Sequence, residues 1–137
     1  MRPIHPCRWL GLAAALALLG WATAHAACPA SPATAHNIDG NGVQAAWWPE
    51  PAALAVSQPF ALLVQLCPVD AVLLRVDAQM PEHRHGMNYR PSIQPLGQGR
   101  WRAEGLLWHM SGRWELRLDV QAQGGAPQRL LQPVLLP

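Results

Sequence analysis

Short runs in which apolar and polar residues alternate dominate the chain after residue 42. The clearest run spans residues 113–120. Its apolar set is Trp114, Leu116, Leu118 and Val120, and its polar set is Arg113, Glu115, Arg117 and Asp119. This period of two is what a β-strand requires when one face is buried and the other is in water.

The same alternation predicts further strands along the chain. One has Phe60, Leu62, Val64 and Leu66 on its buried face, and another has Val72, Leu74, Val76 and Ala78 there, with Arg75 and Asp77 opposite. Residues 43–48, 90–94, 100–109 and 128–136 are further strand candidates, separated by Pro and Gly. About seven strands in roughly 110 residues predict an all-β fold, an immunoglobulin-like antiparallel β-sandwich.

The N-terminal segment has the pattern of an export signal. Arg2 and Arg8 form a charged start, residues 9–21 are almost wholly apolar, and Ala24-His25-Ala26 offers a cleavage site. We expect a signal peptide over residues 1–26, with Ala22-Thr23-Ala24 as a second cleavage site and a retained membrane anchor as the alternative. An irregular segment over residues 27–42 and one β-sandwich domain over residues 43–137 would follow. The predicted location is periplasmic or secreted.

Charge narrows the range of partners. The chain has ten Arg and no Lys; without Arg2 and Arg8, eight Arg face eight Asp and Glu, so the predicted mature chain is neutral. A neutral chain gains little from releasing counterions on a phosphate backbone, so no nucleic-acid partner is expected. Membrane association is expected only if the signal is retained as an anchor.

Two cysteines, Cys28 and Cys67, remain once Cys7 is removed with the signal. In an oxidising compartment they are expected to form a disulfide. It would close a loop of roughly 40 residues and stabilise the fold by about 4 kcal/mol in the chain-entropy model. The alternative makes Cys67 a metal ligand or a reactive thiol.

Most of the candidate metal ligands lie in segment 80–87, whose sequence is Met-Pro-Glu-His-Arg-His-Gly-Met. Imidazole and thioether together favour copper, Cu(I) above all, over cations that prefer oxygen, and zinc is the second choice. Metal binding needs neutral imidazoles, so affinity should fall as the pH drops below about 6. The predicted metal ligands are Met80, His83, His85, Met87 and Met110.

The alternation predicts how these side chains lie. Met80 shares the parity of the buried Val76 and Ala78, and Pro81 interrupts strand pairing after it. On an extended backbone, His83 and His85 would point to the same side.

Ser111-Gly112 is a turn signal that places Met110 near the tip of a hairpin. Met110 shares the parity of Trp108, so it is preferred over His109 as a ligand. His109 is expected at the surface, or as an outer partner that holds another group.

These motifs resemble the YtkA-like domain family, which is related to FixH-like periplasmic domains. The resemblance rests on residues 80–87, on Gly99 leading into Trp101-Arg-Ala-Glu-Gly105-Leu, and on Met110-Ser-Gly-Arg-Trp114, and it covers roughly residues 43–122. It implies an exported immunoglobulin-like sandwich with ties to copper handling or oxidase assembly. The family's His and Met motif falls on the five predicted ligands. Trp101 stands where the family pattern has Tyr.

No enzyme activity is expected. The serines lack a nucleophile motif, and a hydrolytic zinc site would need a third nitrogen or carboxylate ligand at suitable spacing. The sequence thus predicts a copper carrier, buffer or accessory assembly factor, with a copper-handling or oxidase-assembly protein as partner. The alternative is a structural or protein-interaction module that binds no metal.

Overall fold

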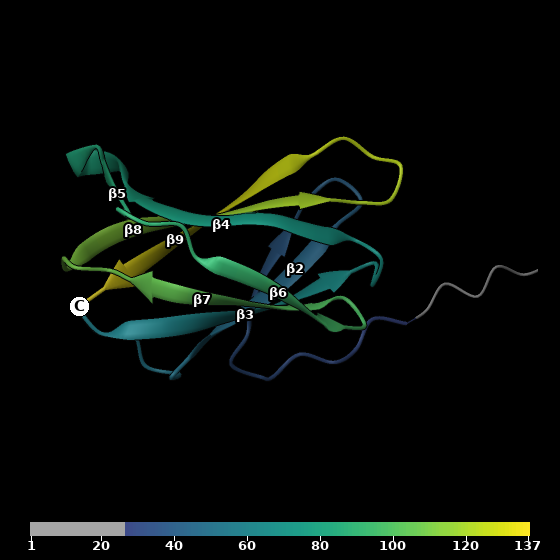
Figure 1. Ribbon diagram of the computed structural model, residues 1–137, viewed down its shortest axis with the longest axis horizontal. Helices are drawn as coiled ribbons and strands as arrows, with labels where there is room; N and C mark the ends of the chain where they lie inside the picture. The colour runs from purple at the N-terminus through teal and green to yellow at the C-terminus, as the bar shows by residue number, and fades with distance from the viewer. Residues whose placement is uncertain (1–26) are drawn as a thin grey trace, which may run out of the picture.

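A computed structural model describes residues 27–137, which form two antiparallel sheets packed face to face (Figure 1). The predicted signal peptide, both of its cleavage sites and the alternative anchor lie outside the described residues. None of the described residues 27–137 form a helix with the length and hydropathy of a membrane span. The all-β prediction is confirmed.

The strands are β1 His36–Asp39, β2 Gln44–Glu50, β3 Pro59–Cys67, β4 Val72–Met80, β5 His85–Gly86, β6 Ser92–Gly97, β7 Arg100–Leu107, β8 Gly112–Gln121 and β9 Gln128–Leu136. One short 3₁₀ helix, η1 Pro81–His83, stands between β4 and β5. The described chain therefore has more strands than the seven predicted, because β1 and β5 are short additions.

The strand order is that of an immunoglobulin-like sandwich. One sheet has the order β1-β2-β3-β7-β6 and the other β5-β4-β8-β9. Leaving β1 aside, these orders correspond to strands A-B-E-D and C′-C-F-G of that fold. Every strand pair is antiparallel, with neighbours such as β8 and β9 joined by a short turn.

The core lies between the two sheets and contains the residues with the buried parity. The largest fully buried side chains include Trp47, Trp108 and Trp114. The alternation predicted for β3 and β8 is confirmed: Phe60, Leu62, Val64, Leu66, Trp114, Leu116, Leu118 and Val120 are all buried. Trp108 stacks on Trp114 with ring centroids 5.3 Å apart, which anchors the end of the sandwich where β7 leads into β8.

The first half of β4 does not follow the predicted alternation. Val72 and Leu74 were expected in the core, yet they are 41% and 45% exposed, while Leu73 is buried. The pairing of β4 with β8 shifts register between Leu73 and Arg75. This irregularity reverses the parity, and beyond it Val76, Ala78 and Met80 face the core as predicted.

The segment over residues 27–42, expected to be irregular, contains strand β1, whose Ile38 enters the core. The disulfide prediction is confirmed. Cys28 is bonded to Cys67 at the end of β3, with their Cα atoms 5.6 Å apart, as a disulfide requires. The disulfide links the start of the described residues to the five-stranded sheet, which contains β3.

Candidate functional site

Two connections meet at one end of the sandwich. The chain leaves β4 through η1 and returns as β5, while β7 leads into β8 through residues 108–111. Because β4 pairs with β8 from Val72 to Gln79, the end of β4 lies beside the start of β8, and η1 contacts β8. Figure 1 shows β5 and η1 at the same end as the start of β8.

His85 and His109 meet at this rim. Their Nε2 atoms are 2.5 Å apart, and their rings are nearly perpendicular, with centroids 4.6 Å apart. Both residues are half-buried. As neutral imidazoles, one ring donates its Nε2 hydrogen and the other accepts it, so the contact joins the two connections.

A tight hairpin positions His85. Arg84 has a left-handed backbone, with φ of 50°, and reverses the chain after η1, so that His85 pairs with Met80 and Gly86 with Gln79. The backbone N–H of Met87 continues the return by donating to the Ala78 carbonyl at 3.2 Å. Since directly paired residues share one face of a sheet, His85 lies on the same face as the buried Met80.

Trp114 positions His109. The His109 ring meets Trp114 edge-on, with centroids 5.7 Å apart, and the Trp114 indole donates to the Met110 carbonyl at 2.9 Å. Trp114 itself is fully buried on β8. The connection between β7 and β8 is therefore fixed to the core at the point where it presents its imidazole.

The three methionines within residues 27–137 differ in their exposure. Met80 is 1% exposed and packs beside Gly112: a Cβ added there would lie 3.0 Å from the Met80 Cε. Met87 is half-buried and packs against the core. Met110 is 39% exposed, at the tip of its turn. The rim thus has one buried, one half-buried and one exposed thioether.

The extended backbone expected from His83 to His85 is not present. His83 ends the 3₁₀ helix, and the left-handed Arg84 follows it, so the parity argument that put both rings on one side does not apply. His83 is exposed, and no hydrogen bond or ring contact joins it to His85.

Tyr89 connects the loop that follows β5 to β7, a strand of the five-stranded sheet. Its hydroxyl donates to the carbonyl of Leu107, at the end of β7 and two residues before His109. The pKa of Tyr89 is raised, chiefly because partial burial disfavours the phenolate. The loop that carries His85 is therefore tied to the strand that leads to His109.

Two imidazole nitrogens that face each other can share a proton in a hydrogen bond or bind one metal ion together. With metal–nitrogen distances of about 2.0–2.1 Å, a tetrahedral ion holds its nitrogen ligands about 3.3 Å apart, so the rings would have to separate by roughly 0.8 Å. Among residues 27–137, no three or more His, Cys, Asp and Glu side chains gather in a metal-binding group.

Sequence reasoning left His109 out of the predicted ligands and placed it at the surface or as an outer partner of another group. The expected strand over residues 100–109 would have turned His109 away from its neighbours, but β7 ends at Leu107, so strand parity does not extend to residue 109. The turn signal at Ser111-Gly112 was the available hint, because residues next to a turn need not alternate.

The fold and this rim define the protein as an immunoglobulin-like β-sandwich with a histidine pair at one end. No protein-family model matches the chain, and no curated protein or solved structure matches it either. The resemblance to YtkA-like domains stays a prediction that rests on the residues quoted for it.

Proposed function

We propose that this protein is an exported copper-binding β-sandwich, a carrier, buffer or accessory assembly factor of the YtkA-like kind that favours Cu(I). The observation that carries the proposal is the approach of His85 Nε2 to His109 Nε2, 2.5 Å apart on two different connections. Both Nε2 lone pairs become available to an ion when the donating ring changes tautomer, so that each neutral imidazole carries its hydrogen on Nδ1.

The ligand set of the proposal is His85 and His109 with a thioether from Met80 or Met87. Met80 is paired with His85 across β4 and β5, and Met87 lies two residues after His85. The backbones of both methionines therefore lie close to that of His85. Two nitrogens and a soft sulfur suit Cu(I) better than zinc, which is usually bound by Cys, His and carboxylates. In this ligand set, His109 replaces His83.

Access and compartment support the same function. Met110 and His83 are exposed while His85 and His109 are half-buried, so a thioether and an imidazole are open to solvent on the same two connections as the proposed ligands. The Cys28–Cys67 disulfide is compatible with an oxidising compartment, as the predicted signal peptide requires. Copper delivery to or from a copper-handling or oxidase-assembly protein would then take place at this end.

The test is competition for Cu(I) between the purified protein, prepared without a His tag, and a coloured Cu(I) chelator. We expect His85→Ala and His109→Ala each to weaken binding at least about tenfold, the lower bound for losing even an outer partner of a metal ligand. His83→Ala is the matched control and should change the affinity little. Equal affinities for the His109→Ala variant and the unmodified protein would refute this ligand set.

A structural or protein-interaction module without metal is the second candidate. Its supporting observation is the same contact, because a hydrogen bond between two neutral imidazoles closes the rim without any ion. Metal analysis after purification from copper-replete cells separates the two functions. Stoichiometric copper supports the carrier, whereas absence of both copper and zinc, with chelator-independent partner binding, supports the module.

A further inference from the structure

The turn between β1 and β2, residues 40–43, brings two side-chain carbonyl carbons next to glycine nitrogens. Asp39-Gly40 and Asn41-Gly42 each place a carboxyl or amide carbon one residue before a glycine. When the glycine nitrogen attacks that carbon, the backbone closes into a five-membered imide. A glycine hinders the attack least because it has no Cβ. The sequence alone therefore offers two reactive pairs in one turn.

The folded turn protects the first pair. The Gly40 N–H donates to the Val43 carbonyl at 2.8 Å, so its nitrogen is already hydrogen-bonded. The Asp39 carboxylate accepts from the Gln44 Nε2 at 3.0 Å, and an ionised carboxylate has no good leaving group. Gly40 also lies against β9, where an added Cβ would be 2.5 Å from the Gln128 Oε1. Closing an imide at Asp39 would break these contacts.

The second pair has no such restraint on its reacting atoms. Asn41 and Gly42 are both exposed, and among residues 27–137 neither the Asn41 side-chain amide nor the Gly42 nitrogen has a hydrogen-bond partner. Gly42 has φ of 71°, and nothing lies within 4 Å of a Cβ added there. Only the Asn41 main chain is held, since Gln128 accepts from its N–H and donates to its carbonyl, both at 2.8 Å.

Asn41 also differs from the two other asparagines of the chain. Asn37 precedes Ile38, and Asn88 precedes Tyr89, so a branched or aromatic side chain crowds the attacking nitrogen at both positions. Asn37 lies within β1, whose backbone is paired with β2. The mobile amide, the unbonded nitrogen and the following glycine occur together at Asn41.

We propose that Asn41 is a site of spontaneous deamidation. The Gly42 nitrogen gives its proton to hydroxide and bonds to the Asn41 Cγ. The bond from Cγ to the amide nitrogen breaks, and that nitrogen takes a proton from water and leaves as ammonia. Water then opens the imide at either of its carbonyls, which gives aspartate or isoaspartate. No oxidant or reductant takes part.

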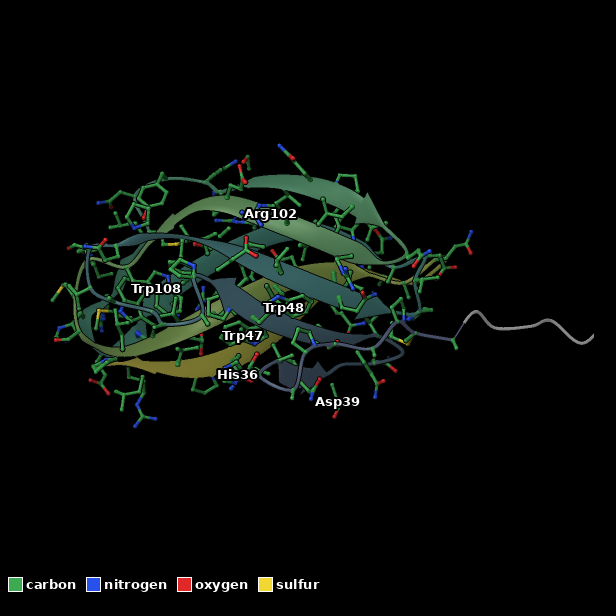
Figure 2. The ribbon with its side chains drawn as sticks, turned by 90° about the horizontal axis from the view of Figure 1, so that it is seen from below. His36, Asp39, Trp47, Trp48, Arg102 and Trp108 are labelled. Atoms are coloured by element: carbon green, nitrogen blue, oxygen red, sulfur yellow. A yellow bond between two sulfur atoms is a disulfide. The ribbon has the colours of Figure 1, made fainter. Side chains whose placement is uncertain are left out.

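The reaction changes how the turn joins the two sheets. In isoaspartate the main chain runs through the former side-chain carbon, so the Asn41 carbonyl that accepts from Gln128 of β9 becomes a free carboxylate. Either product adds one negative charge to the turn. Figure 2 shows Asp39, just before this turn, well away from Trp108, the neighbour of His109, so the modification is independent of the proposed copper site.

The first test is incubation of the purified full chain at neutral and at mildly alkaline pH, followed by peptide mass spectrometry. We expect the mass change from amide to carboxylate at Asn41 before any at Asn37 or Asn88. Its rate should rise in proportion to the hydroxide concentration, because the attack requires loss of a proton. Isoaspartate should form at position 41 ahead of Asp39. Equal rates at the three asparagines, or isoaspartate at Asp39 first, would overturn the proposal.

Variants and an unfolded control then test the role of the turn. Asn41→Ser keeps a side chain suited to turns, and it should abolish the acidic form that isoelectric focusing detects as the unmodified protein ages. Asn88→Ser is the matched control and should leave the rate of that form unchanged. In urea the Gly40 hydrogen bond is lost, so isoaspartate at Asp39 should increase relative to that at Asn41. An acidic form that persists in Asn41→Ser, or an unchanged ratio in urea, would contradict selection of Asn41 by the folded turn.

Discussion

At the scale of residues, the rim depends on close packing between Met80, Gly112 and Trp114. Met80 and Trp114 are fully buried, and Gly112 has φ of 118°, a backbone conformation that residues with a Cβ rarely adopt. A methyl group at Gly112 would lie 3.0 Å from the Met80 Cε. The glycine therefore lets β8 begin directly against Met80, one of the two thioethers that we propose as the sulfur ligand.

We predict that Gly112→Ala lowers the free energy of unfolding by about 1–3 kcal/mol, from backbone strain and from displacement of Met80. Gly105→Ala is the matched control, because Gly105 also has a positive φ, of 85°, but nothing lies within 4 Å of its added Cβ. Urea denaturation measures both variants. An equal loss in both would show that the contact with Met80 contributes nothing.

The positions of single residues in the site could be predicted from the sequence only in part. The burial of Met80 followed from strand parity. The His and Met pattern pointed to His85, whose role as a ligand stays a prediction. The placement of His109 did not follow from either, because it depends on where β7 ends and on the edge-on contact with Trp114, a residue of the next strand. Alternation predicts the faces of residues inside a strand and says little about the residues in a turn.

At the scale of elements, β4 marks the limit of the alternation rule. The pattern was sufficient for β3 and β8, where every residue of the predicted buried face is buried. In β4, Val72, Leu73 and Leu74 are all apolar, so the sequence does not reveal which of them faces inward. The register shift between Leu73 and Arg75 determines which of these three side chains faces inward. That shift arises from pairing with β8, which is distant in the sequence.

We predict unequal effects for two neighbouring leucines of β4. Leu73→Ala should cost about 2–5 kcal/mol of stability because it leaves a cavity in the core, where Leu73 is 3% exposed. Leu74→Ala should cost less than about 1 kcal/mol, because that side chain is 45% exposed. Thermal unfolding of both variants measures the difference. The reverse order would mean that β4 keeps the uninterrupted alternation.

At the scale of the whole molecule, the disulfide and β1 join the N-terminal segment to the sandwich. The sequence predicted the cysteine pair from compartment and count, and it predicted the fold class from strand spacing. It missed β1, because residues 36–39 show only one apolar side chain, Ile38. Pairing of β1 with β2 and the nearby crosslink, neither of which is local, make this segment a strand.

We predict that Cys28→Ala/Cys67→Ala lowers the free energy of unfolding by about 4 kcal/mol, since the closed loop spans a separation of 39 residues. Urea denaturation measures the loss. The unmodified protein in excess reductant is the control and should unfold at the midpoint of the double variant. An unchanged midpoint in both would contradict a stabilising role for this crosslink.

The central claim is that the rim of the sandwich binds copper through the paired imidazoles and a thioether. X-ray absorption of the Cu(I)-loaded protein tests it most directly, because sulfur and nitrogen neighbours scatter differently. We predict two nitrogen neighbours and at least one sulfur neighbour, with the nitrogen contribution reduced in His109→Ala and retained in His83→Ala. A spectrum with no sulfur neighbour, or one that His109→Ala leaves unchanged, would contradict the claim.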